Sequence, residues 1–422
     1  MSPTHSTDGI DFAYLDEGSG PAFVFQHGLG GDSSQPRELW DGTGRLVCLE
    51  CRGHGRTTPL GAPEELGFAT FARDLASLLD ALDLDEVVLG GVSMGAGVAL
   101  RLAYEQPERI RALVLVRPAW FTAASPANLN AFPVIAELLR TEGRERGRGS
   151  FQTSEVYRRI REQSRVGADS LLAQFERPQA IERAALLERL PADRPLPDAG
   201  PWPRLAMPSL VIGTEQDPVH PFACAEAWAQ ALPAGTLRKV TPKTVDHARY
   251  DEDVTAAIGV FLSSTHATRP LTAADLAYME RVMLWAGFPP DREPPAGWRE
   301  MPHVRRFLDG WGRSGDVGVV AVDARERPLG AAWARALDEP ALRDEAGAAV
   351  PELAIAVEPH ARGNGVGGAL LDALAEAARH AGHRELSLTV SPRNPAARLY
   401  ARRGFEPLRA DALGLVMRRR LE

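Results

Sequence analysis

Lysine, long apolar runs and a basic charge balance are missing or scarce in this chain, and each scarcity excludes a class of function. The chain has 48 lysines and arginines, but only Lys239 and Lys243 are lysines, and neither follows a glycine-rich loop. A nucleoside-triphosphate P-loop is therefore excluded, and Schiff-base chemistry is not expected. The formal net charge of -8 argues against a nucleic-acid-binding protein. No apolar run is long enough to span a bilayer and no signal-peptide core opens the sequence, so we expect a cytoplasmic protein without a membrane partner.

Cysteine is also scarce. Cys48, Cys51 and Cys224 cannot form a disulfide framework. Cys48 and Cys51 have the C-x-x-C spacing of redox and zinc sites, but they lie at the end of a predicted strand, without a helix start or a second pair of ligands. The sequence therefore predicts buried apolar thiols and no metal site.

The chain has two unlike halves. From Ile10 to about residue 262, short apolar segments alternate with segments of helical periodicity, which predicts a parallel sheet covered by helices on both faces. Between about residues 119 and 205 this alternation stops, and helix-forming sequence predicts a helical cap. Within the cap, the arginine-rich residues 140–150 are expected to form a mobile, solvated loop, and attraction of an acidic substrate is the alternative. The predicted strands are residues 22–26, 45–50, 86–91, 112–116 and 209–214.

A polar segment, residues 263–270, is the predicted linker, and we place the domains at residues 1–265 and 266–422. The second domain begins with a helix and continues with an antiparallel hairpin around the turn "RERP". A strand, a long helix, another strand and a last helix follow. The expected fold class is α/β in both domains, with a parallel sheet and cap in the first and a mixed sheet in the second.

The segment Gly91-Val92-Ser93-Met94-Gly95 fits the pattern Gly-x-Ser-x-Gly and lies between a predicted strand and a predicted helix. In this context the pattern indicates a nucleophile elbow, in which the serine occupies a strained turn between small neighbours. A glycine-rich helix start without a catalytic role is the alternative. No lysine accompanies the turn, so a phosphate-binding loop is disfavoured.

A second loop supports the elbow. Residues 26–31, "QHGLGG", follow a predicted strand. At such a position the backbone N–H of Leu29 can join that of Met94, the residue after the nucleophile, in an oxyanion hole. The two donors would stabilise the negative charge that develops when Ser93 attacks a carbonyl group.

A serine nucleophile also needs a base and an orienting acid, which in this type of fold follow it in the order acid, then histidine. Asp217 lies just beyond a predicted strand and His247 lies in a later loop, so this pair fits the order. The segment after the preceding strand, "LVRPAW", holds no carboxylate. Glu215 and Asp246 are weaker candidates for the acid.

Residues 10–262 resemble the α/β-hydrolase family, through "RGHGRT" at residues 52–57 and through the elbow within "GVSMGAGVALRLAYEQPERIRALVLV". Within the family they are similar to the lactonase, esterase and cofactor-free haloperoxidase branch. The resemblance implies acyl-enzyme catalysis without a cofactor, in which Ser93 attacks the carbonyl, His247 transfers the proton and Asp217 holds the imidazole tautomer.

Three other residues of this half have structural interpretations. Glu50 stands where many relatives have an aspartate, a change that we expect to be neutral for the chemistry. His27 and His54 belong to glycine-containing turns and have no carboxylate partner in the expected order, so we interpret both as structural.

A second glycine cluster spans Arg362 to Gly368, "RGNGVGG", and also matches G-x-G-x-x-G. A dinucleotide-binding fold would need an acidic residue at the end of the following strand. That strand ends in "SLTVSPRN" without a carboxylate, and Glu385 lies at its start. The pattern alone therefore does not indicate a dinucleotide site.

Residues 269–422 instead resemble the GNAT N-acetyltransferase family. The family signature Arg/Gln-x-x-Gly-x-Gly/Ala is present at residues 362–367, and the second family motif is present as "NPAARLYARRGFE" at residues 394–406. Small residues in the first motif let backbone N–H groups and the helix dipole approach the pyrophosphate of coenzyme A. The resemblance implies acetyl-CoA as the cofactor, bound by Val357, Arg362, Gly363, Asn364, Gly365, Val366, Gly367, Gly368 and Asn394.

The same resemblance gives roles to two side chains. Tyr400 would protonate the departing thiolate, and Glu352 would act as general base, directly or through water. A packing tyrosine and a surface glutamate at a strand start are the alternatives. Asn394 before Pro395 also forms a good helix start, which is its purely structural interpretation.

These features predict a bifunctional enzyme. Its first domain would hydrolyse an ester, lactone or amide of a small molecule, and its second would transfer acetyl from acetyl-CoA to a small-molecule amine. In one alternative only the acetyltransferase is active, and the first domain is a binding or scaffolding module. In another, the second domain senses the cofactor without catalysis. The sequence leaves the substrates and the oligomeric state open.

Overall fold

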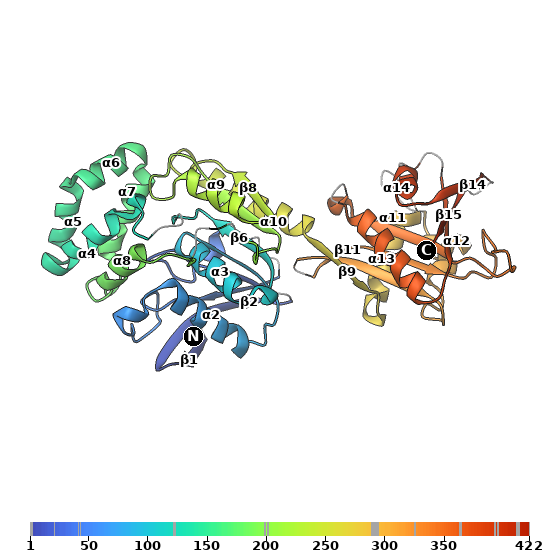
Figure 1. Cartoon of the computed structure of the whole chain (residues 1–422), viewed down its shortest axis with the longest axis horizontal. Helices are drawn as coiled ribbons and strands as arrows, with labels where there is room; N and C mark the ends of the chain where they lie inside the picture. The colour runs from blue at the N-terminus through green and yellow to red at the C-terminus, as the bar shows by residue number, and fades with distance from the viewer. Residues whose placement is uncertain are drawn as a thin grey trace. The chain divides into compact units, whose positions relative to one another are not determined.

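The computed structural model describes residues 3–20, 22–40, 42, 44–120, 124–197, 200, 202–287, 295–324, 326–362, 365–391, 394, 396–410 and 414–421. The chain divides into two compact units, Met1–Phe261 and Leu262–Glu422, each built around its own sheet (Figure 1). None of the helices in the described part of the chain is both long and apolar enough to cross a membrane.

The first unit contains an eight-stranded sheet in the order β1-β2-β4-β3-β5-β6-β7-β8. β1 and β2 are antiparallel to their neighbours, and β3 to β8 are parallel to one another. Every residue of β3, β5 and β7 is buried, as expected for central strands with helices on both faces. The bounds are β1 Thr4–Thr7, β2 Ile10–Gly18, β3 Ala22–Gln26, β4 Arg45–Leu49, β5 Val87–Val92, β6 Ile110–Val116, β7 Ser209–Gly213 and β8 Gly235–Lys239.

Sequence analysis does not predict β1, β2 and β8. β1 and β8 have no buried residue and β2 mixes buried with exposed positions, so these marginal strands lack the continuous buried run of the central strands. The helices that surround the sheet are α1 Gln35–Glu38, α2 Phe68–Ala81, α3 Met94–Glu105, α9 Phe222–Ala231 and α10 His247–Ser264. Of these, α3 packs on β3, β5 and β6, and α9 packs on β7 and β8.

In the described part of the segment between β6 and β7, five α-helices form the cap: α4 Ala131–Thr141, α5 Gly143–Thr153, α6 Glu155–Gln163, α7 Arg165–Glu176 and α8 Ala184–Ala192. Figure 1 shows them gathered in one group. The prediction of a loop at residues 140–150 is wrong, because most of that segment belongs to the helix α5. Phe151 is fully buried, and a Cβ placed on Gly147 would lie 2.9 Å from the carbonyl oxygen of Leu138. Close packing against α4 therefore stabilises a helix that its composition alone disfavours.

The second unit contains a seven-stranded sheet in the order β14-β15-β13-β12-β11-β10-β9. Among its described pairings only that of β12 with β13 is parallel. The bounds are β9 His266–Pro270, β10 Val317–Asp323, β11 Pro328–Arg335, β12 Glu352–Val357, β13 Glu385–Val390, β14 Glu406–Ala410 and β15 Leu415–Arg420, with helices α11 Leu276–Gly287, α12 Pro302–Leu308, α13 Val366–His380 and α14 Ala396–Arg402.

Two apolar clusters cover opposite faces of this sheet. Ala332 and Ala334 pack in the cluster of α13, whereas Ala331 and Trp333 pack in that of α11 and α12. The alternation along β11 follows from the two-residue period of a strand. The prediction that residues 263–270 form a linker needs correction. His266–Pro270 forms the strand β9, which pairs with β10.

Candidate active sites

Ser93 lies in a sharp turn between β5 and α3. Its φ of 56° and ψ of -112° belong to a region that residues other than glycine seldom occupy. A hydrogen bond of 2.9 Å from Ser93 N to the carbonyl oxygen of Val116 holds the turn. A Cβ placed on Gly91 would lie 2.3 Å from the carbonyl carbon of Gly95, and one placed on Gly95 would lie 2.3 Å from the carbonyl oxygen of Gln26. Both glycines are therefore needed for the elbow that presents Ser93 at the carboxyl end of β5.

The base in contact with this serine is His220. Its Nε2 lies 2.9 Å from Oγ of Ser93, and its Nδ1 lies 3.1 Å from each carboxylate oxygen of Asp217. The backbone N–H groups of Val219 and His220 donate hydrogen bonds to Oδ1 of Asp217, so a tight turn after β7 fixes both side chains. Serine, histidine and aspartate thus have the connectivity of a catalytic triad.

His247, the base predicted from the sequence, is not at the nucleophile. It begins α10 with 58% of its side chain exposed, and its Nε2 lies 3.7 Å from Asp251 Oδ2. The first turn of α10 directs this ring outward, while the loop after β7 brings His220 to Ser93. The spacing of three residues in "DPVH" is the signal that could have suggested His220, because one turn can hold both groups.

Arg117 is a charged neighbour that sequence analysis missed. It follows β6 with a φ of 49°, and its Nε lies 2.9 Å from Oδ2 of Asp217. Its Nη2 also donates to this oxygen and lies 2.9 Å from Nδ1 of His220. The segment "LVRPAW", which holds no carboxylate, therefore supplies a cation that pairs with Asp217.

The positive charge of Arg117 acts on both partners. Burial alone would raise the pKa of Asp217, but Arg117 and His220 outweigh burial and hold that pKa far below its ordinary value. Burial lowers the pKa of His220; Asp217 opposes this effect, while Arg117 and Lys243 add to it. His220 is therefore neutral at neutral pH, as a general base must be.

Only one tautomer of His220 suits that role. A guanidinium cannot accept a hydrogen bond, so Nδ1 either donates to Asp217 or accepts from Arg117. Donation to Asp217 leaves the lone pair on Nε2, where it can accept the proton of the Ser93 hydroxyl. The carboxylate therefore selects the productive tautomer against the competing guanidinium.

The loop predicted to supply the oxyanion hole lies against Ser93. A Cβ placed on Gly28 would be 3.6 Å from Cβ of Ser93. Gln35 accepts a 2.7 Å hydrogen bond from Gly28 N, which fixes the loop next to Leu29. Met94 is the first residue of α3, so its N–H has no acceptor within the helix. Met94 follows Ser93 directly in the chain, and Leu29 follows Gly28, which lies against Ser93.

His27, Glu50 and His54, which the sequence analysis interprets as structural residues, are buried. His27 and His54 lie with ring centroids 4.7 Å apart, and both hydrogen-bond to backbone groups through Nδ1. Nε2 of His27 accepts a hydrogen bond from Cys51 N. Glu50 accepts hydrogen bonds from Ser33 and from both the backbone and the side chain of Arg56. The cysteines are also buried and unpaired.

In the second unit, the neighbouring strands β12 and β13 are paired over only part of their length. The parallel pairing of β12 with β13 is confined to Glu352 opposite Ser387 among the described residues. Beyond that point the backbone of β12 can pair with an inserted chain, which fits the expected binding of acetyl-CoA at Val357. At that end of β12, Val357 O accepts a 3.0 Å hydrogen bond from Nε of Arg362.

The glycine loop that follows is partly described, since Gly363 and Asn364 lie outside the described residues. Gly365 has a φ of 82° and precedes Val366, the first residue of α13. A Cβ placed on Gly368 would lie 2.4 Å from Nη2 of Arg403, so a guanidinium borders the start of this helix. Backbone N–H groups at a helix start together with a cation fit the pyrophosphate of coenzyme A.

The other transferase residues occupy defined positions. Asn394 accepts a 2.9 Å hydrogen bond from Ala396 N and thereby begins α14, which is the structural role considered above. Tyr400 is buried in edge-on contact with Phe405, and burial raises the pKa of Tyr400 to about 12. This phenol therefore keeps its proton at neutral pH.

Glu352 is not a surface residue. Only 2% of it is exposed, and its Oε1 accepts hydrogen bonds of 3.1 Å from Arg306 Nη2 and from Thr389 Oγ1. Its Oε2 has no hydrogen-bond partner among the described residues. A buried carboxylate with one free oxygen can accept a proton from a group placed beside it.

Comparisons with known proteins assign both units. A model of the alpha/beta hydrolase fold matches residues 21–154, and a model of the acetyltransferase (GNAT) family matches residues 282–405. A putative carbamate hydrolase, RutD of Agrobacterium fabrum, is 29% identical over 227 residues, which are 51% of this chain and 83% of that protein. A non-heme chloroperoxidase of Kitasatospora aureofaciens is 39% identical over 114 residues, 26% of this chain and 41% of that protein.

Among solved structures, a carboxylesterase of the thaumarchaeon Nitrososphaera gargenis superposes with a TM-score of 0.52 at 18% identity, covering 62% of this chain and 98% of that one. This likeness concerns the fold alone. Together with the elbow and the separated strands of the second sheet, the family matches establish that the chain joins an alpha/beta hydrolase domain to a GNAT acetyltransferase domain.

Proposed function

We propose that the first unit is a serine hydrolase acting on an ester, lactone or amide of a small molecule. The observation that carries this proposal is the 2.9 Å contact between Ser93 Oγ and His220 Nε2 at a strained elbow. An amide-type substrate is also compatible with the relative described as a putative carbamate hydrolase.

The proposed reaction proceeds through an acyl-enzyme. Ser93 Oγ forms a bond to the carbonyl carbon while His220 takes its proton, and the N–H groups of Leu29 and Met94 stabilise the oxyanion. His220 then gives the proton to the leaving alcohol or amine. Water, deprotonated by His220, releases the acid and restores Ser93, so the reaction consumes one water molecule and needs no cofactor.

For the second unit we propose acetyl transfer to a small-molecule amine. Acetyl-CoA, when bound, supplies the activated acetyl group. Glu352 accepts a proton from the amine through its free Oε2, directly or through water, and Tyr400 holds a proton for the departing sulfur. The glycine loop before α13 and Arg403 would hold the pyrophosphate.

The hydrolase proposal is tested with a fluorophosphonate probe, which reacts with an activated serine. The folded wild type should become labelled at Ser93, and both Ser93→Ala and heat-denatured wild type should remain unlabelled. Hydrolysis of p-nitrophenyl esters should be lost with the label. A folded wild type that resists the probe would favour a binding module instead of an enzyme.

The transferase proposal is tested by release of free thiol from acetyl-CoA in the presence of pooled amines. Thiol release should depend on added amine and should fall in Glu352→Gln. Binding of acetyl-CoA without transfer to any amine of a broad panel would support a cofactor sensor.

A further inference from the structure

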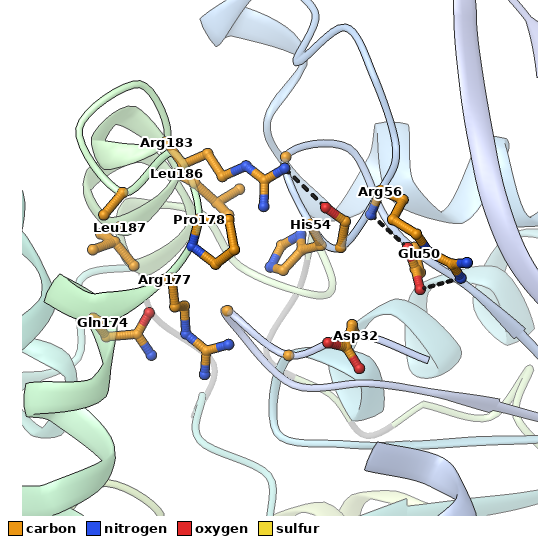
Figure 2. Close-up of a pocket in the computed structure, with 15 residues that line it drawn as sticks. Asp32, Glu50, His54, Arg56, Gln174, Arg177, Pro178, Arg183, Leu186 and Leu187 are labelled. Carbon is orange, nitrogen blue, oxygen red and sulfur yellow. Dashed lines mark hydrogen bonds and ion pairs between the residues drawn. The ribbon is translucent and has the colours of Figure 1, made fainter. Parts of the chain in front are cut away.

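A cavity of about 250 Å³ lies between the cap and the loops that follow β3 and β4. Its core side is formed by the segment around Gly30 and Asp32 and by the segment from Gly53 to Arg56, and its cap side by the connection from α7 to α8. Figure 2 shows Arg177, Pro178 and Arg183 of the cap facing His54 and Asp32 of the core. Ser93 does not line this cavity, so the proposed chemistry does not account for it.

Arg177 is an unpaired cation in the cavity wall. Its Nε is buried and has no hydrogen-bond partner among the described residues, and none of the described carboxylates forms an ion pair with it. Burial lowers the pKa of Arg177, and the negative charge of Asp32 acts on this pKa in the opposite direction. By contrast, Arg183 donates to the carbonyl oxygen of Gly55 and to Gln179.

The carboxylates that line the cavity already have partners. Glu50 accepts three hydrogen bonds from Ser33 and Arg56, and Asp32 accepts two from Ser34. These bonds outweigh burial and hold the pKa of Glu50 below its ordinary value. The lining nevertheless carries the guanidinium groups of Arg56, Arg177 and Arg183 against only the carboxylates of Asp32 and Glu50, so it has an excess of positive charge that an anion beside the unpaired Arg177 would balance.

His54 provides a second unsatisfied group. Its Nδ1 lies 3.0 Å from the carbonyl oxygen of Arg52, which can only accept, so Nδ1 carries the proton and Nε2 has a free lone pair. Only 1% of His54 is exposed, and Nε2 has no partner among the described residues. Figure 2 shows the ring directed toward Pro178 and Arg177. A neutral imidazole with a free lone pair does not pair with a carboxylate, so in this part of the wall an anion is assigned to Arg177.

The cavity lies on the acyl side of the nucleophile. Residues that follow β3 and β4 line it, whereas His220 follows β7, and β5 with Ser93 lies between them in the sheet. Because His220 gives its proton to the leaving group, that group must lie on the β7 side, and the acyl chain points the other way.

The distance between Ser93 and Arg177 is short enough for one small molecule to reach both. Gly28 packs against Ser93, and a Cβ placed on Gly30 would lie 2.5 Å from Nε of Arg177. Cα atoms two residues apart are separated by at most about 7 Å, so a chain of a few carbons can connect the two places.

Resting on the hydrolase function proposed above, we propose that the cavity binds a carboxylate at the far end of the substrate's acyl chain, paired with Arg177. The preferred substrates are then half-esters or half-amides of dicarboxylic acids. Arg177 is a specificity residue in this proposal and takes no part in bond making.

The test compares mono-p-nitrophenyl esters of glutarate and adipate with neutral p-nitrophenyl esters of equal chain length. Wild type should show the higher kcat/KM on the anionic esters. Because a hydrogen bond to a charged group contributes about 1.5–3 kcal/mol, Arg177→Gln should lower kcat/KM on the anionic esters by about tenfold or more. The neutral esters should change less than about twofold, since they make no charged contact. The same substitution at the exposed Arg158 of α6 is the matched control and should alter neither class.

Equal losses on both classes in Arg177→Gln, or a wild-type preference for the neutral esters, would overturn the proposal. Failure of the hydrolase function itself gives a different result, namely no turnover of any ester. In that case calorimetric titration of glutarate into the Ser93→Ala variant still tests whether the cavity binds a carboxylate. Binding that is lost in Ser93→Ala/Arg177→Gln supports the cavity assignment, and absence of binding refutes it.

Discussion

The assignment of His220 as the base leads to a direct comparison of two histidines. The identical change, His220→Gln and His247→Gln, removes a basic nitrogen at each position and keeps a polar side chain of similar size. Nε2 of His220 is 2.9 Å from the nucleophile, whereas the ring of His247 is mostly exposed beside Asp251. Among the described residues, His220 is the histidine that forms a hydrogen bond with Ser93.

The size of the expected effect follows from the role of the base. General-base catalysis contributes about 10²–10⁴-fold, which corresponds to roughly 3–5 kcal/mol in the barrier. The upper part of this range is expected for His220→Gln, because the contact is direct, buried and oriented by Asp217. His247→Gln should stay within about twofold of wild type, since exposed ion pairs contribute little.

The assay is kcat/KM on a neutral p-nitrophenyl ester, together with the rate of fluorophosphonate labelling. Circular dichroism and the melting temperature establish that both variants are folded. A large loss in His247→Gln with retained activity in His220→Gln would refute the reasoning and restore the assignment made from the sequence.

Three further expectations concern other parts of the chain. A general base works when it is neutral, and removal of the Arg117 charge raises the pKa of His220, so Arg117→Met should move the acid limb of the pH profile of kcat/KM to higher pH; an unmoved limb would show that Arg117 does not act on His220. Gly95→Ala should destabilise the first unit by about 1–3 kcal/mol, because its Cβ would lie 2.3 Å from the carbonyl oxygen of Gln26; a melting temperature equal to that of wild type would contradict this. Glu352→Gln should reduce acetyl transfer by about 10²-fold while calorimetry finds acetyl-CoA binding unchanged, and a fall in binding alone would point to a structural role.

Local sequence was sufficient for the parts of this protein that depend on neighbouring residues. The Gly91–Gly95 motif determined the elbow, because glycine at both ends is what the backbone contacts of that turn require. The apolar runs of β3, β5 and β7 predicted the central strands, since strands buried on both faces carry no polar alternation. The start of α13 at Val366 likewise follows from the small residues before it.

Tertiary structure decided which distant groups meet. The order of residues along the chain favoured His247, but the turn that Asp217 forms with its own following backbone brings His220 to Ser93. Arg117 became part of the site because β6 ends beside the loop after β7, a neighbour relation set by strand order. The unpaired Arg177 faces a cavity only because the cap folds back over the loops after β3 and β4. Contacts of this kind depend on packing between segments at least a hundred residues apart in the chain, and no local pattern records them.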